Sequence, residues 1–520
     1  MIPLLDPTPP DPEPANSASL LEVESLPIVP QKGTGALVVA GTFWLLVQTL
    51  GSKFVTLGGQ LVLAWLLSPE DFGQIGMAYT VTAFAALLIN PGIDVILVRR
   101  GKHFQLWSTP AFYFSFCAGL LGCAAILIAA PFAARIYGSG QLTGLLAVLA
   151  FATPIGSFML VPTAKLRSEM RFGMLSLITF LQSILQTLLT LAFAALGYGV
   201  YAFVLPMPIV YAASAAALWI VSRPAVSIRT PFRHWRYLIG DTSYIFFQRV
   251  LQTAVSQGDY ILLGALYGAA IVGPYFFAFG IATQAIRLTA GSLQLVLLAG
   301  LSRFTAFSEQ QTQAALKATG ALALVGMPLC MIQAAIVGPL LRAIYGEKWL
   351  AAIPLVQLIS VGLAFDVASW PVGSLLQARG QFRFLFWWSS LFAPIFLMFI
   401  SIGGLWAQSL GVATAVCIYY AAFSPALAFW VFRRSGISWL EIGGVFLRPT
   451  AVGLLSAVAT LLTIQLAAMA HLPPLVQCGL AAISGFVTMG VGARFITPSS
   501  WNELLAKLIH AFPVLSPLRR

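Results

Sequence analysis

Residues 109–131 read TPAFYFSFCAGLLGCAAILIAAP and contain no Asp, Glu, Lys or Arg. About 20 such residues in a helix cross the ~30 Å hydrocarbon core of a bilayer. The whole chain has the same character, with 59% hydrophobic residues, 8% charged residues and a mean hydropathy of +0.90. This composition excludes a water-soluble globular domain.

Similar apolar runs recur from Val38 almost to the end of the 520-residue chain. They predict an all-α polytopic membrane protein with about 14 transmembrane helices. The expected spans are residues 38–67, 72–98, 109–131, 142–162, 173–196, 200–222, 237–267, 271–300, 319–344, 350–376, 384–404, 408–432, 449–470 and 475–495.

The formal net charge is +12, and the Lys and Arg residues behind it are distributed according to the expected topology. With the N-terminus in the cytoplasm, 22 of the 28 Lys and Arg residues fall in expected cytoplasmic segments, and only Arg135, Arg342 and Lys348 fall in outside loops. This asymmetry is the positive-inside rule. The basic balance therefore indicates orientation and contact with anionic membrane lipid, not nucleic acid. We expect a bacterial inner-membrane protein with both termini in the cytoplasm.

The chain divides into six expected regions. We expect a Pro-rich, acidic and disordered cytoplasmic tail at 1–34, an N-lobe at 35–222 and a basic linker at 223–236. A C-lobe should follow at 237–432, two further helices at 433–497 and an amphipathic cytoplasmic tail at 498–520. Capping-box spacing also predicts short surface helices at 308–318 and 500–510.

The two lobes look like repeats of six helices each. An offset of 200 residues lays Gly73 on Gly273, and an offset of 210 lays residues 166–172 on 376–382. Six helices per lobe give parallel repeats related by an axis along the membrane normal. Such a pair would enclose a central cavity between the lobes.

Three sequence motifs resemble the polysaccharide transporter family, the Wzx-type oligosaccharide flippases of the multidrug/oligosaccharidyl-lipid/polysaccharide exporter superfamily. They are LSPEDFG at 67–73, NPGID at 90–94 followed by VRRG at 98–101, and KLRSEMRF at 165–172. The resemblance covers the first third of the chain.

The resemblance implies alternating access and a substrate built on undecaprenyl diphosphate. The protein would then carry lipid-linked oligosaccharide units to the periplasmic leaflet for exopolysaccharide, capsule or O-antigen. A polymerase and other assembly proteins are possible partners. The lipid II flippases are similar but have cations inside helices 1, 2 and 8, and this chain has none in helix 2.

Three cations fall inside expected helices: Lys53, Arg249 and Arg287. Each lies at a depth of roughly 18 to 22 Å from the cytoplasmic helix ends. A charge inside the membrane must face water, a partner or a substrate. Guanidinium groups bind phosphate oxygens in bidentate pairs, so the trio fits a diphosphate headgroup. The alternative is that the arginines pair with Asp241, Asp259 or Asp366 and lock helices together.

Asp366 is the most isolated intramembrane acid and the candidate for coupling to an H⁺ or Na⁺ gradient. Asp259 lies near a helix end, where we expect interfacial water to solvate it. Asn90, Pro91 and Gly92 combine a missing backbone donor with a flexible neighbour and predict a kink or hinge.

Chemistry other than transport has little support in the sequence. Five cysteines without CxxC spacing and four scattered histidines predict no metal site, and no cofactor is expected. No nucleophile elbow or phosphate-binding Gly loop is present. A membrane glycosyltransferase or polymerase acting on the same lipid carrier, and a multidrug exporter of the same superfamily, are the alternative functions.

Overall fold

The computed structural model describes residues 34–89, 104–169, 171–224, 226–227, 235–289, 297, 300–301, 304 and 307–498. Regular structure in these ranges is helical. The elements are α1 (Thr34–Leu66), α2 (Pro69–Ile89), α4 (Phe104–Ile136), α5 (Gln141–Ser157), α6 (Leu160–Ser168), α7 (Phe172–Ala195), the 3-10 helix η2 (Gly199–Phe203), α8 (Pro206–Ser222), α9 (Trp235–Tyr267), α10 (Ala269–Thr289), α12 (Glu309–Tyr345), α13 (Ala352–Ala378), α14 (Phe382–Arg434), α15 (Trp439–Met469) and α16 (Pro474–Ile496).

Among the described residues, nine helices are long and apolar enough to cross a membrane. An all-α polytopic membrane fold is therefore confirmed, while the total of 14 spans stays a prediction. Observed bounds follow the expected ones closely, as in α7, which was expected at 173–196 and runs from Phe172 to Ala195. The agreement reflects a physical length requirement, because each apolar run must span the same hydrocarbon thickness.

The longest element, α14, is a helical hairpin. Its backbone leaves helical geometry at Ala407 and Gln408, the point where the sequence separates two expected spans. Ring pairs step away from this turn on both sides, with centroids 4.8 Å apart for Phe396 and Tyr419 and 4.5 Å apart for Phe384 and Trp430. The two arms of α14 therefore run antiparallel.

Two expected elements differ from those observed. The surface helix expected at 308–318 is the first part of α12, because the Ser308 hydroxyl caps that helix by accepting from the Gln311 amide at 3.1 Å, and no break follows. The span expected at 142–162 breaks after Ser157. Pro162 has no amide hydrogen to donate to the Phe158 carbonyl, which accepts instead from Trp219 Nε1 at 2.9 Å.

Helix bounds repeat along the chain at the two offsets found in the sequence. Helices α1 and α9 end at Leu66 and Tyr267, an offset of 201, and α2 and α10 begin at Pro69 and Ala269, an offset of 200. Glu169 and Arg379 are the C-caps of α6 and α13, an offset of 210. We call residues 34–222 the N-half and residues 235–434 the C-half.

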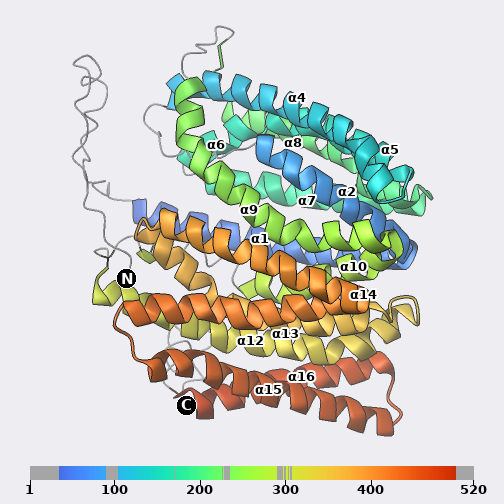
Figure 1. The fold of residues 1–520 in the computed structure, drawn as a ribbon, viewed down its shortest axis with the longest axis vertical. Helices are drawn as coiled ribbons and strands as arrows, with labels where there is room; N and C mark the ends of the chain where they lie inside the picture. The colour runs from blue at the N-terminus through green and yellow to red at the C-terminus, as the bar shows by residue number, and fades with distance from the viewer. Residues whose placement is uncertain are drawn as a thin grey trace.

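Figure 1 shows the arrangement of these parts. Helices α4 to α8 lie on one side, α12 to α14 lie on the other, and α1, α2, α9 and α10 lie between them. Helices α15 and α16 pack on α12 at the far edge, outside both halves. Large apolar side chains such as Leu455, Leu466 and Phe495 are exposed there, as expected where lipid tails are the solvent.

Several expected features lie outside the described residues. They are the disordered tail except for Thr34, the amphipathic tail except for Pro498, and most of the basic linker. Residues 235 and 236, the last two of the expected linker, lie in α9.

Candidate functional site

The three intramembrane cations lie on helices α1, α9 and α10. Lys53 and Arg249 are half-buried, and for Arg287 the structure describes the backbone within α10 but not the side chain. At 1.5 Å per residue, Lys53 lies about 20 Å from the end of α1 at Leu66, and Arg249 lies about 27 Å from the end of α9 at Tyr267.

Arg287 lies about 27 Å from the start of α10 at Ala269. The two arginines therefore share a level, and Lys53 lies about 7 Å nearer the turns. Whether the three side chains converge stays a prediction. The expected hinge at Asn90, Pro91 and Gly92 lies outside the described residues, because α2 is described only as far as Ile89.

The halves meet closely where α1 turns into α2 and α9 turns into α10. We call this the outer end, because the expected topology places these turns outside. A Cβ on Gly73 would overlap the backbone of Ala269, and a Cβ on Gly273 would overlap the backbone of Pro69. The contact is reciprocal and lies at equivalent positions of the two offset segments. Only glycine permits so close an approach of two backbones.

An aromatic cluster fills the space beside this glycine contact. Phe72, which is 1% exposed, packs edge-on against Phe203, Phe277 and Trp349 with centroids 5.2 to 5.7 Å apart. Phe277 and Trp349 are tilted against each other at 4.0 Å. Edge-to-face aromatic pairs add stability beyond their buried area. The cluster joins α2 and η2 of the N-half to the C-half.

Side chains from the C-half also satisfy carbonyl groups at the end of α1. The Tyr345 hydroxyl donates to Leu61 O at 2.8 Å, and Trp349 Nε1 donates to Ala64 O at 3.0 Å. Lys348 Nζ donates to Trp65 O at 3.0 Å. The last carbonyls of a helix have no partner within the helix, so the C-half recognises this helix terminus directly.

One further hydrogen bond joins the halves deeper in the bundle. Thr80 Oγ1 on α2 donates to Gln257 Oε1 on α9 at 3.2 Å, about 16 Å from the outer turns. Lys53, Arg249 and Arg287 all lie further from the outer end than this bond. The outer end is therefore closed, and the cations lie on the opposite side of the closure.

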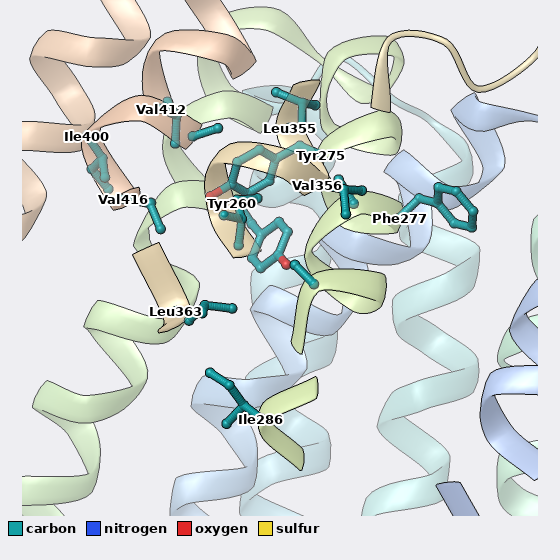
Figure 2. Close-up of a cluster of buried hydrophobic side chains, with 14 of the residues drawn as sticks. Tyr260, Tyr275, Phe277, Ile286, Leu355, Val356, Leu363, Ile400, Val412 and Val416 are labelled. Atoms are coloured by element: carbon teal, nitrogen blue, oxygen red, sulfur yellow. The ribbon is translucent and has the colours of Figure 1, made fainter. Parts of the chain in front are cut away.

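Asp259 is buried, contrary to the expectation of interfacial water. Its side chain is 2% exposed, with one oxygen accepting from the Tyr275 hydroxyl at 2.7 Å and the other from the Tyr260 amide at 2.9 Å. Figure 2 shows both tyrosines inside an apolar cluster that includes Leu363 and Val416. The prediction failed because the position of Asp259 along α9 says nothing about α10, which supplies Tyr275.

Asp366 on α13 is also held by neutral donors. Trp370 Nε1 donates to one carboxylate oxygen at 3.0 Å, and the Ser424 hydroxyl donates to the other at 2.8 Å. The residue keeps part of its surface accessible.

The alternative of structural ion pairs stays a prediction, because the side chains of Arg287 and Asp241 lie outside the described ranges. Within those ranges, Asp259 and Asp366 bind hydroxyl, indole and amide donors and form no ion pair with a cation.

The sequence reasoning missed Tyr345, Lys348 and Trp349. A signal was present, because these residues form an aromatic and cationic turn, YGEKW at 345–349, between two apolar spans. Their acceptors lie about 285 residues away along the chain, which no local pattern reveals.

The family model described as "Polysaccharide biosynthesis protein" matches residues 62–354, more than half of the chain. The chain belongs to this family. As a Wzx-type member of the exporter superfamily, it resembles the succinoglycan biosynthesis transport protein ExoT of Rhizobium meliloti, with 22% identity over 79% of this chain and 82% of ExoT. It also resembles the lipopolysaccharide biosynthesis protein WzxC of Escherichia coli, with 23% identity over 75% of this chain and 81% of WzxC.

Solved structures show that this family member shares a known fold. The lipid II flippase MurJ in an inward closed conformation matches with a TM-score of 0.68 and 13% identity, over 88% of this chain and 99% of MurJ. The Vibrio cholerae MATE transporter VcmN matches with a TM-score of 0.54 and 12% identity, over 80% of this chain and 100% of VcmN. The relatives are transporters and flippases, so the expectation of a transport protein and not an enzyme is confirmed.

Proposed function

We propose that this polysaccharide biosynthesis transport protein is a flippase for oligosaccharide units linked to undecaprenyl diphosphate. It would carry them from the cytoplasmic to the periplasmic leaflet of the bacterial inner membrane by alternating access between two pseudo-equivalent lobes. Both termini would lie in the cytoplasm, and a polymerase would receive the product outside.

The observation that carries the proposal is the position of the cations relative to the closed outer end. Reciprocal contacts of Gly73 and Gly273 close that end, and Lys53, Arg249 and Arg287 lie at least about 20 Å from its turns. A diphosphate that entered from the cytoplasmic side would meet them before the closure. Cations in a low-dielectric cleft attract an anion over several ångströms.

The names of the relatives support a polysaccharide substrate. ExoT is a transport protein of succinoglycan biosynthesis, and TuaB of Bacillus subtilis, 21% identical over 68% of this chain and 74% of TuaB, serves teichuronic acid biosynthesis. The two names refer to different polymers. A carrier that recognises the shared lipid diphosphate, and tolerates the sugar, fits such a family.

Asp366 is the proposed coupling residue. Its carboxylate is held by two neutral donors, Trp370 and Ser424, and keeps accessible surface. A carboxylate in this position can exchange a proton or a sodium ion when the bundle opens to either side. Asp259 is buried and accepts hydrogen bonds at both oxygens, so we assign it a structural role.

Reconstitution tests the proposal. Proteoliposomes containing fluorescent undecaprenyl-diphosphate-linked oligosaccharide report inward-to-outward movement as protection from, or exposure to, an added glycosidase. We expect Lys53→Ala, Arg249→Ala and Arg287→Ala each to lower the initial rate about tenfold to hundredfold, the loss of one charge-assisted phosphate contact of about 1.5 to 3 kcal/mol.

Arg135→Ala is the matched control, because Arg135 is an exposed cation at the end of α4, remote from the trio. It should move the lipid at the wild-type rate. Wild-type rates in all three test variants would contradict the proposed headgroup site but not the flippase function. If the wild-type protein moves no lipid-linked sugar but exports cationic drugs, its function is multidrug efflux and not flipping.

A further inference from the structure

A cavity of about 440 Å³ opens on the N-half, away from the contact between the halves. Its volume lies within the range of ligand-binding pockets. Only apolar side chains of α4, α5, α8 and the α5–α6 break line it: Phe112, Ile155, Phe158, Ala212, Ala215, Ala216 and Trp219. The helices that carry the proposed diphosphate-binding cations, α1, α9 and α10, contribute none of these residues.

The cavity arises from a local break and a row of small side chains. At the break after α5, the indole of Trp219 donates to the Phe158 carbonyl, which Pro162 leaves without its helical partner. Phe112 packs edge-on against both Phe158 and Trp219 at 5.5 Å. On α8, Ala212 and Ala216 are exposed, and their small size leaves the space beside these rings unfilled.

A basic cluster lies one helical turn from the cavity. Lys165 Nζ donates to the carbonyls of Ser222 and Arg223 at 2.7 and 3.0 Å, and the Arg223 amide donates to Trp219 O at 2.9 Å. Arg171 reaches the same helix end, with its guanidinium 3.4 Å from Val221 O.

The cluster keeps a positive charge after its internal pairing. Among the described residues, Lys165, Arg171 and Arg223 lie beside one carboxylate, Glu169, which is 3.7 Å from Lys165 and 3.5 Å from Arg171. Arg171 and Arg223 are exposed. A hydrophobic cavity thus lies next to Lys165, Arg171 and Arg223, whose three positive charges exceed the one negative charge of Glu169.

We propose that this cavity and cluster bind one anionic phospholipid of the surrounding bilayer, with an acyl chain in the cavity and the phosphate on the cluster. The two parts match the two parts of such a lipid in chemistry and in order along the membrane normal. Basic pockets between membrane helices on the cytoplasmic side bind anionic headgroups. The site is separate from the diphosphate site, so it does not depend on the transported substrate.

Native mass spectrometry of the detergent-solubilised protein tests the cavity. Phosphatidylglycerol and phosphatidylethanolamine are added in turn, and retained lipid is counted. We expect the wild type to hold one phosphatidylglycerol, and Ala216→Leu, which fills the cavity, to lose it. The control Ala213→Leu enlarges a neighbouring exposed alanine of α8 that does not line the cavity, and it should retain the lipid.

A second pair of variants tests the charge without touching the packed interior. Arg171→Gln with Arg223→Gln should reduce the preference for phosphatidylglycerol over phosphatidylethanolamine at least tenfold. Retention of the lipid by Ala216→Leu, or an unchanged preference in the double variant, would overturn the site. Displacement of the bound phosphatidylglycerol by equimolar undecaprenyl phosphate would also overturn it, since the carrier lipid would then be the occupant.

Discussion

The two halves share helix bounds but differ in what they place at equivalent positions. Asp259 of the C-half corresponds at the 200-residue offset to Gly59, which packs against Thr187. Asp366 corresponds at the 210-residue offset to Gly156, whose Cβ would meet the Tyr211 ring at 3.3 Å. Both carboxylates of the C-half thus have glycine counterparts used for close helix packing. Within the described ranges, the N-half has no acid at the positions equivalent to Asp259 and Asp366.

A second difference concerns how each half holds the segment that follows α5 in the N-half and α13 in the C-half. In the N-half, Lys165 donates to two carbonyls at the end of α8. In the C-half, Arg379 donates to the side chains of Gln311, Thr312 and Ser435 at 3.1, 2.7 and 3.1 Å. A guanidinium group serves three acceptors in fixed directions where an ammonium group serves two. Arg379 thus makes three bonds alone, whereas the N-half divides the task between Lys165 and Arg171, which donates to Val221 O.

The reciprocal contact of the halves should be the most sensitive to substitution. Gly73→Val and Gly273→Val each place a branched side chain against the backbone of the other half. The overlap can be relieved only by moving the main chain of one half away from the other. We expect export to fall more than tenfold in both variants, by equal amounts because the contact is symmetric. The initial rate of lipid-linked oligosaccharide movement in proteoliposomes measures this.

Gly58→Ala is the control for the glycine variants, because a Cβ there meets nothing within 4 Å. Its rate should equal that of the wild type. If one glycine variant transported normally while the other failed, the two halves would not be equivalent at the outer end, whatever their offsets.

The carboxylate difference predicts a smaller but more specific effect. Asp366→Asn keeps an oxygen to accept from Trp370 or Ser424 but removes the charge. We expect an approximately tenfold lower rate and no response to an imposed H⁺ or Na⁺ gradient. Glu347→Gln, at an exposed acid of the outer turn, should leave both unchanged. A gradient response that survives Asp366→Asn would move coupling away from this helix.

The second difference predicts the smallest effect, on stability alone. Arg379→Met removes three hydrogen bonds from a charged donor, to Gln311, Thr312 and Ser435, and we expect a cost of about 1 to 3 kcal/mol. Gln311 Oε1 keeps the Phe307 amide as a donor. Lys165→Met exposes carbonyls near the surface and should cost less than about 1 kcal/mol. Thermal unfolding in detergent compares the two. Equal losses would show that the two ties are equivalent.

Much of the fold could be predicted from the sequence, because bilayer thickness imposes a length on every apolar run. The break in α14 at Ala407 and the equivalence of Gly73 with Gly273 were both visible as patterns. The continuity of α12 through residues 308–318 was not, since a capping box marks where a helix begins and not where it ends.

The candidate site was predicted less completely, for a physical reason. Lys53, Arg249, Arg287 and Asp366 stand out because a charge inside the membrane is costly. The burial of Asp259 depends on Tyr275, which lies on another helix. The donors that close the outer end act on carbonyl oxygens, which every residue carries and no sequence pattern distinguishes.

Helix α1 belongs mechanically to both halves. Its middle packs on α7, where Gly51 meets the Phe180 ring, and its end is bonded to Tyr345 and Trp349 of the C-half. Lys53 lies between these two attachments. Binding at Lys53 and bonding at the helix end are then thermodynamically linked. If a ligand binds Lys53 more tightly when the helix end is bonded, its binding stabilises those bonds. Breaking the bonds lowers the affinity for the ligand by the same factor. One helix can in this way report occupancy of the interior to the opposite face of the membrane.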